Sequence, residues 1–379
     1  MDKGMDIELA ICALALHAVL FLSPSSLTDS VALLRQRAQS GVPAFRLKKT
    51  TEALARKLGA APPNWRLAEA TLAWLGPARK VLTPLHPDYP PLLRTIPFAP
   101  PILFVAGNSA HLSASQVAVI GSRNSTPGGR DFAYQLSAEL SGAKFLITSG
   151  MARGIDSAAH RGAMDKHGGT LAVFGCGIDR IYPRQNARLA AEIAESGALI
   201  SEFPLGTPPI AYHFPLRNRI ISGLAAGTVV VEANLRSGSL ITAQCALEQG
   251  REVFAVPGST NNPMSKGCHA LIKQGAQLVE SAADVIAGLP AHALPQYLNV
   301  LPPPKHPEAE RSEISTDSNT DAVLVALGHE PVGLDILLER TGLTHKILSS
   351  ILLALELAGR VRTLEGGYYE RPVSLRHCP

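Results

Sequence analysis

Short apolar runs alternate with helical patterns between residues 117 and 289. The runs are rich in Val, Ile and Leu, which is typical of strands buried on both faces. Between them apolar residues recur at helical spacing. The runs are VAVIG (117–121), FLITS (145–149), TLAVF (170–174), ALIS (198–201), TVVVE (228–232), VFAV (253–256) and AQLV (276–279). This alternation predicts an α/β fold with a doubly wound, mostly parallel sheet, which binds ligands at the carboxyl edge of its strands.

The segments before this pattern predict a helical domain and a connector. Apolar positions recur at helical spacing from residue 7 to about residue 80, so residues 1–80 are expected to form a small helical domain. It is comparable to a SAM or helix-hairpin-helix module, but a clean Gly–apolar–Gly hairpin is missing, which favours scaffolding or partner docking over DNA contact. Residues 81–116 are rich in proline and apolar residues and predict a packed connector with a short strand at 102–105.

The segments after the pattern predict a linker and a second compact domain. Residues 291–318 are polar and proline-bearing, as in a linker. Residues 319–379 contain three amphipathic helical patterns followed by two short strand patterns around Gly366-Gly367, which is the order of a winged helix. The third helix has only His345 and Lys346 as basic polar residues, so protein docking and duplex binding both stay open.

Composition and charge narrow the classes of protein only moderately. The chain has 379 residues, 46% hydrophobic and 17% charged, with a formal charge of +4, which permits an acidic partner without demanding one. The apolar stretch 7–22 is interrupted by Glu8 and His17 and is shorter than the roughly 20 residues of a membrane span, so a buried helix is expected. Five scattered cysteines without a C-x-x-C pair indicate neither zinc nor disulfides and favour the cytoplasm.

Glycine, small hydroxyl residues and arginine recur in the loops after the predicted strands. Gly121-Ser122-Arg123 follows the first strand and leads into a helical pattern, and such a helix start favours an anion through its free N–H groups and its dipole. Arg123 adds a planar, permanent cation suited to phosphate. The predicted phosphate or DNA contacts along this edge are Gly121, Ser122, Arg123, Ser149, Gly150, Arg153, Arg184, Phe214, Arg217, Arg219 and Lys266.

Several of these residues have an equally ordinary structural interpretation. Arg217 and Arg219 are two positions apart at a helix start, so one is expected to bind ligand while the other forms a structural pair. Phe214 is as well explained by core packing as by stacking on a base. Asp156 and Glu232 could act as general bases, but each could equally cap a helix or pair with an arginine. For Asp156 and His160, four positions apart on one helix face, a packed, hydrogen-bonded pair is expected.

Other common sites are not supported by the sequence. The chain lacks G-x-x-x-x-G-K-[ST], which disfavours a P-loop ATPase, and Gly175-x-Gly177 lacks the third glycine of a dinucleotide site. H-E-x-x-H and His/Asp clusters are also missing. We therefore expect neither a metal nor a cofactor.

Several long motifs occur in the order found in one known family. They are GSRNSTPGG, ITSGMARGIDSAAHRGA, GCGIDRIYPRQN, the run from FPLRNRIISG to REVFAVPG, and SKGCHALIKQGA. Over residues 80–290 the chain resembles the DNA-processing protein A (DprA/Smf) family. The resemblance implies an extended Rossmann-like domain in a non-enzymatic homodimer. The resemblance also implies a protein that binds single-stranded DNA, protects it during natural transformation and loads the RecA recombinase onto it. The DNA contacts it implies are Gly121, Ser122, Arg123, Arg184, Phe214, Arg217 and Arg219.

Two other functions remain open from the sequence. The same type of sheet occurs in nucleotide-hydrolysing enzymes of the lysine-decarboxylase-like group, but their Pro-Gly-Gly-x-Gly-Thr-x-x-Glu run is missing from this chain. The other alternative is an adaptor whose anion site is vestigial. If the protein instead binds single-stranded DNA, a basic groove that follows the DNA backbone predicts salt-sensitive, sequence-tolerant binding.

Overall fold

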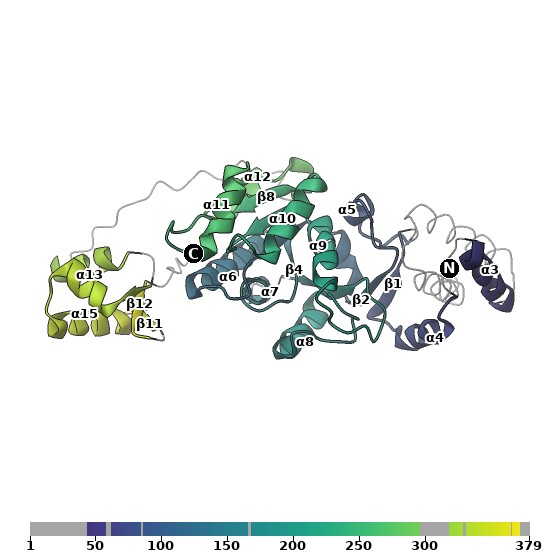
Figure 1. Cartoon of the computed structure of the whole chain (residues 1–379), viewed down its shortest axis with the longest axis horizontal. Coiled ribbons are helices and arrows are strands. Elements are labelled where there is room, and N and C mark those ends of the chain that lie inside the picture. Colours follow the sequence, from purple (N-terminus) through teal and green to yellow (C-terminus); the bar gives the residue numbers. More distant parts are fainter. Residues whose placement is uncertain are drawn as a thin grey trace. The chain divides into compact units, whose positions relative to one another are not determined.

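The computed structural model describes residues 44–57, 62–84, 86–165, 168–295, 318–328, 331–364 and 366–371 (Figure 1). Contacts divide the chain into two units, Met1–Pro302 and Pro303–Pro379. The helices predicted before residue 44 and most of the predicted linker lie outside the described residues. The first unit contains the sheet together with α3 (Ala44–Lys57) and α4 (Trp65–Trp74).

A nine-stranded sheet forms the centre of the first unit, in the order β1-β2-β6-β5-β4-β3-β7-β8-β9. The strands from β3 to β9 pair in parallel, whereas β2 pairs antiparallel with β6 and β1 pairs antiparallel with β2. The predicted doubly wound, mostly parallel sheet is therefore confirmed. The strands are β1 (Arg79–Leu82), β2 (Leu103–Gly107), β3 (Gln116–Ile120), β4 (Leu146–Ser149), β5 (Thr170–Val173), β6 (Ala198–Ser201), β7 (Gly227–Val230), β8 (Glu252–Ala255) and β9 (Gln277–Leu278).

The beginning of β1 corrects the sequence prediction at one boundary. Residues 79 and 80 belong to this strand and not to the predicted helical region. Helix α4 ends at Trp74 and is followed by Gly76-Pro77, which cannot continue a helix. Strand β1 then pairs with β2, whose residues were predicted as the short strand of the connector.

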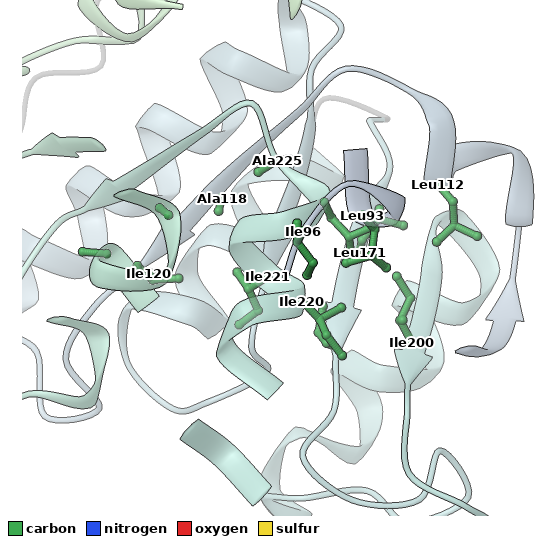
Figure 2. Close-up of a cluster of buried hydrophobic side chains, with 14 of the residues drawn as sticks. Leu93, Ile96, Leu112, Ala118, Ile120, Leu171, Ile200, Ile220, Ile221 and Ala225 are labelled. Carbon is green, nitrogen blue, oxygen red and sulfur yellow. The ribbon is translucent and has the colours of Figure 1, made fainter. Parts of the chain in front are cut away.

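Helices cover both faces of the sheet, because each strand points successive side chains to opposite faces. Ala118 and Ile120 of β3 join the cluster beneath one set of helices, shown in Figure 2, and Val117 and Val119 join the cluster on the other face. The first set is α5 (Pro91–Arg94), α9 (His213–Leu224), α10 (Gly238–Glu248) and α11 (Lys266–Lys273). The opposite face packs on α4, α6 (Pro127–Gly142), α7 (Ile155–Asp165), α8 (Ala187–Ser196) and α12 (Ala282–Gly288).

The order of the strands changes direction between β3 and β7, and this position is the topological switch point of the sheet. Strands β4, β5 and β6 follow on one side of β3, whereas β7, β8 and β9 extend on the other side. Loops leaving β3 and β7 therefore diverge to opposite faces, and a crevice opens between them at the carboxyl edge.

The second unit has the predicted winged-helix order. It contains α13 (Ser318–Leu327), β10 (Val332–Gly333), α14 (Leu334–Thr341), α15 (His345–Leu357), β11 (Arg362–Leu364) and β12 (Tyr368–Glu370). The three strands pair in the order β10-β12-β11 around a small core that includes Val323, Leu337 and Leu352. The two-residue strand β10 was not predicted, since two residues give no periodicity.

Candidate functional site

An open cleft of about 660 Å³ lies at the carboxyl edge, where the loops after β3 and β7 separate. Its walls come from the β3 loop, the beginning of α7, the loop before α9, α9 itself and the beginning of α10. Residues lining it include Gly121, Ser122, Arg123, Asn124, Ala152, Asp156, Tyr182, Phe214, Arg217, Asn218, Asn234, Ser237, Ser239, Thr242 and Met264. Five of the predicted contacts are therefore gathered in one cleft: Gly121, Ser122, Arg123, Phe214 and Arg217.

The loop after β3 is held firmly beside this cleft. Ser122 donates from its main-chain N–H to the carbonyl of Glu232 at 2.7 Å, and the Gly121 carbonyl accepts from Ser239 Oγ at 2.8 Å. The Ser122 hydroxyl accepts from Asn124 N–H at 3.1 Å and lies 3.5 Å from the sulfur of Met264. Ser122 is thus buried and engaged, and the exposed part of the loop is Arg123 with Asn124.

The start of α6, where the sequence predicts a phosphate, is occupied by a carboxylate of the protein itself. The Glu232 carboxylate accepts hydrogen bonds there from Thr126 N–H at 2.8 Å and from Thr126 Oγ1 at 2.5 Å. Thr126 in turn caps the helix by accepting from Gly129 N–H at 3.0 Å. An internal carboxylate therefore occupies the position that a bound anion would take.

The start of α10 lies on the cleft instead. Ser237 caps this helix, and Ser237, Gly238 and Ser239 all line the cleft. Positive charge from the dipole of α10 is therefore directed toward a ligand in the cleft. The sequence prediction placed the anion at the other helix, although Ser-Gly-Ser before an apolar helix is itself a cap signal.

Arg123 and the aromatic residues form the exposed rim. The Arg123 guanidinium carbon lies 5.4 Å from the centre of the Phe214 ring, and Arg123 makes no hydrogen bond to another described residue. Phe214 also contacts Tyr182, with ring centres 5.6 Å apart. Phe214 thus lines the cleft and supports Arg123, whereas Tyr182 has 44% of its surface exposed. Sequence reasoning did not single out Tyr182 as a site residue, because a tyrosine before a proline carries no specific signal.

Arg217 forms part of the cleft floor and is only 4% exposed. Its guanidinium donates to the carbonyl of Gly150 at 2.8 Å and also to the carbonyl of Val173. Burial lowers the pKa of Arg217 to about 10, and the nearby Asp156 carboxylate opposes this shift. Burial raises the pKa of Asp156, which Arg217 opposes in turn. The Arg217 guanidinium therefore holds the ends of β4 and β5 together beneath the cleft.

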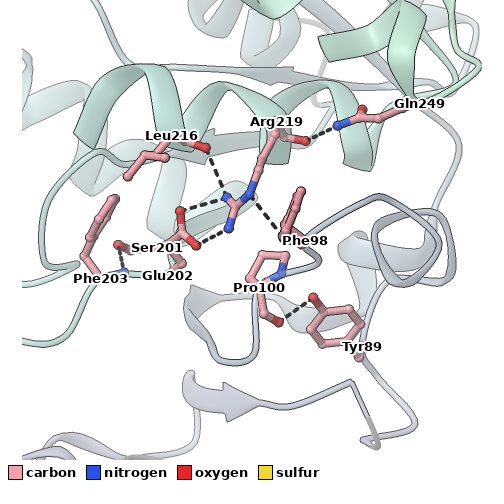
Figure 3. Close-up of polar contacts among 9 residues, drawn as sticks. All are labelled: Tyr89, Phe98, Pro100, Ser201, Glu202, Phe203, Leu216, Arg219 and Gln249. Carbon is pink, nitrogen blue, oxygen red and sulfur yellow. Dashed lines mark hydrogen bonds and ion pairs between the residues drawn. The ribbon is translucent and has the colours of Figure 1, made fainter. Parts of the chain in front are cut away.

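Arg219 is engaged in a structural ion pair outside the cleft lining (Figure 3). Its guanidinium binds both carboxylate oxygens of Glu202, at 2.8 and 2.5 Å, and donates to the carbonyls of Phe98 and Leu216. The guanidinium therefore ties α9 to the end of β6 and to the loop before β2. Arg217 and Arg219 do face different ways, but both are occupied by contacts within the protein.

The remaining predicted contacts are divided between the interior and the surface. Ser149 is fully buried and donates to the carbonyl of Val119 at 2.7 Å. A side chain at Gly150 would meet the Arg217 guanidinium at 2.6 Å, so this glycine admits the arginine. The exposed residues Arg153, Arg184 and Lys266 lie on loops or helix starts at the same sheet edge, outside the residues that line the cleft.

The acidic residues considered as general bases both have structural partners. Asp156 accepts from Ala152 N–H at 3.2 Å and neighbours Arg217, while Glu232 holds the loop after β3. The expected hydrogen bond between Asp156 and His160 is not formed, because His160 Nδ1 is bonded to Thr170 Oγ1 at 2.8 Å. What the cleft offers a ligand is donor groups, one exposed cation and an aromatic surface.

Within the described part of the chain, no group of three or more His, Cys, Asp or Glu side chains is arranged to hold a metal ion. Also within it, every helix is too short or too polar to cross a membrane.

The fold and the cleft define an α/β protein with a crevice at the switch point of its sheet, whose chain also contains a winged helix. The chain belongs to the DNA recombination-mediator protein A family, whose model matches residues 80–290. The DprA winged helix domain matches residues 307–367. The resemblance inferred from the motifs is therefore confirmed.

Individual relatives extend the similarity beyond the sheet. Protein Smf of Escherichia coli K12 is 44% identical over 309 residues, covering 79% of this chain and 80% of that protein. DNA processing protein DprA of Streptococcus pneumoniae R6 is 46% identical over 199 residues, covering 52% of this chain and 70% of that protein.

Two solved structures share the fold. The X-ray structure of DprA from Streptococcus pneumoniae superimposes with a TM-score of 0.61 at 34% identity, covering 76% of this chain and 99% of that one. DprA from Helicobacter pylori, described with a single-stranded DNA binding mode, gives a TM-score of 0.51 at 29% identity and covers 55% of this chain and 94% of that one.

Proposed function

We propose that this protein is a DNA-processing protein that binds single-stranded DNA, with the sugar–phosphate backbone lying in the cleft between the β3 loop and the start of α10. The observation that carries this proposal is the cleft at the switch point, where Arg123 is exposed and makes no hydrogen bond to another described residue. A phosphate beside Arg123 would receive charge-assisted hydrogen bonds, and the dipole of α10 would add to them.

The shape and chemistry of the cleft favour an unpaired strand. Tyr182 is exposed next to Phe214 and offers a surface on which a base can stack, an interaction worth about 1–3 kcal/mol per base and tolerant of sequence. Stacking of this kind requires a base that is not already stacked within a duplex. Arg153, Arg184 and Lys266 are exposed at the same sheet edge and would contact phosphates as the strand continues. The single-stranded DNA binding described for the Helicobacter pylori protein supports the same choice of ligand.

The biological role rests on family membership. The names of the Streptococcus pneumoniae and Bacillus subtilis relatives describe DNA processing proteins. We propose that this chain protects incoming single strands during natural transformation and loads the RecA recombinase onto them, acting in the cytoplasm as a homodimer. The loading step is tested by RecA-dependent strand exchange on DNA strands already coated with a single-strand-binding protein. If this protein loads RecA, exchange should begin sooner when it is added.

We propose a binding role without catalysis. The two carboxylates considered as general bases, Asp156 and Glu232, accept hydrogen bonds from Ala152 and Thr126, so neither is poised to take a proton from a ligand. Release of free base from nucleotides tests this directly. Turnover that disappears when Asp156 or Glu232 is changed would instead support the nucleotide-hydrolysing alternative.

Fluorescence anisotropy with a labelled oligothymidylate and a matched duplex is the basic test. The proposal predicts tighter binding of the single strand and an affinity that falls steeply as salt is added. Equal affinity for the duplex, or an affinity independent of salt, would contradict it.

A further inference from the structure

Glu232 holds the loop that carries Arg123 at both of its ends. On one side of Arg123, the main-chain oxygen of Glu232 accepts from Ser122 N–H at 2.7 Å. On the other side, its carboxylate accepts from the N–H of Thr126 at 2.8 Å and from its hydroxyl at 2.5 Å. The side chain comes from the end of β7, a strand distant in sequence, and the residue is only 6% exposed.

The carboxylate also fills the space at the start of α6. A Cβ atom placed on Gly129 would lie 2.4 Å from the Glu232 carboxyl carbon, so only glycine allows the carboxylate to come this close. Thr126 links Glu232 to Gly129, because its hydroxyl donates to the Glu232 carboxylate and accepts from Gly129 N–H. The negative carboxylate therefore neutralises the positive end of the α6 dipole, as a bound phosphate would do in a related strand–loop–helix unit.

We propose that Glu232 is a positioning residue for DNA binding: its carboxylate acts as an internal substitute for a phosphate at α6 and fixes the β3 loop so that Arg123 faces the cleft. This inference rests on the proposed single-stranded DNA binding. It also makes the start of α6 unavailable to a nucleotide phosphate, which leaves the cleft at α10 for the strand.

The sign of the expected effect separates positioning from simple electrostatics. Removing a negative charge near a DNA-binding cleft strengthens binding if the charge acts only through its field. Glu232→Gln removes the charge and one of the two acceptor oxygens, so the Thr126 end of the loop loses one of its two hydrogen bonds to this side chain. We expect oligothymidylate to bind about fivefold more weakly to this variant, the effect of losing roughly one hydrogen bond.

The control is Thr126→Ser, which keeps both groups that donate to Glu232 and should bind like the wild type. Thr126→Ala keeps only the main-chain N–H and should be intermediate, and it serves in place of Glu232→Gln if that variant does not fold. Unchanged or tighter binding by folded Glu232→Gln, or by folded Thr126→Ala where it takes that variant's place, would overturn the inference while leaving the proposed function intact. Failure of the wild type to bind oligothymidylate would overturn both.

A double-variant cycle and a chemical rescue supply readouts that a general loss of stability would not change. Because Glu232 acts through Arg123, Glu232→Gln should weaken binding much less when Arg123 is already Ala. In Glu232→Ala, acetate should restore affinity relative to the same concentration of chloride, since a free carboxylate can occupy the vacated space. Fully additive effects, or equal behaviour in acetate and chloride, would contradict a positioning role.

Discussion

The floor and the rim of the cleft each contain an arginine that lies against the ring of Phe214, yet the two arginines differ in burial and in hydrogen bonding. Arg217 on the floor is buried, bonded to main-chain carbonyls and accompanied by Asp156. Arg123 on the rim is exposed and makes no hydrogen bond to another described residue. Each guanidinium lies within 6.0 Å of the centre of the Phe214 ring. This difference in burial is why we propose a structural role for the first arginine and a ligand contact for the second.

The largest expected effect is the loss of folding stability when Arg217 on the cleft floor is replaced. Arg217→Ala leaves the buried carbonyls of Gly150 and Val173 without their charged donor, and leaving a buried acceptor unsatisfied costs about 1–3 kcal/mol of folding free energy for each group. Urea unfolding measures this loss. The control is Arg184→Ala, an exposed arginine whose removal should change stability by no more than about 0.5 kcal/mol. Equal stability of the two variants would remove the distinction between floor and rim.

Acid should weaken the interior beside the floor and spare the rim. His160 is fully buried, and burial lowers its pKa to about 3. The unfolded chain binds a proton near pH 6.5 and the folded chain does not, so this contribution to stability is complete above pH 6.5 and is lost as the pH falls toward 3. By pH 4.5 the loss amounts to about 3 kcal/mol.

Urea unfolding between pH 7 and pH 4.5 tests this prediction against His160→Gln, which cannot titrate. The raised pKa of Asp156 acts in the opposite direction and is common to both proteins. The variant should therefore lose less stability than the wild type over this range. Parallel pH profiles would show that His160 is not held neutral.

The rim should control DNA affinity with little effect on stability. Arg123→Ala removes one phosphate contact, which we expect to weaken oligothymidylate binding about tenfold and to reduce the salt slope by about 0.7. Arg123→Lys keeps the charge and should retain the slope while losing part of the affinity, because an ammonium does not form a planar fork. Anisotropy titrations at several salt concentrations measure both quantities, and a variant with an unchanged slope would show that the phosphate lies elsewhere.

The smallest expected effect on DNA binding concerns Arg219, which the sequence predicts as a DNA contact but which is paired with Glu202. Its pair with Glu202 is bidentate and largely buried, so Arg219→Ala should cost about 1–3 kcal/mol of stability. The salt slope of DNA binding should stay the same, since the guanidinium is already bound to a carboxylate. A lower slope in a folded Arg219→Ala protein would place Arg219 on the rim.

The sequence was sufficient for the central strands β3 to β7, because they are buried along their whole length and appear as continuous apolar runs. Strand β1 is partly exposed and was not predicted. The sequence also located the Gly121–Arg123 loop correctly at the carboxyl edge. It could not show that Glu232 closes the start of α6, because Thr126 and Glu232 are 106 positions apart in the sequence and no local pattern connects them. It could not separate Arg123 from Arg217 either, since burial depends on how α9 packs against the loops after β4 and β5.

A crystal structure of the protein with a short oligothymidylate is the most direct measurement. We predict a phosphate within hydrogen-bonding distance of the Arg123 guanidinium and of main-chain N–H groups at the start of α10, with the Glu232 carboxylate still bonded to Thr126. A strand bound at another surface, with the Arg123 loop free of contact, would contradict the account.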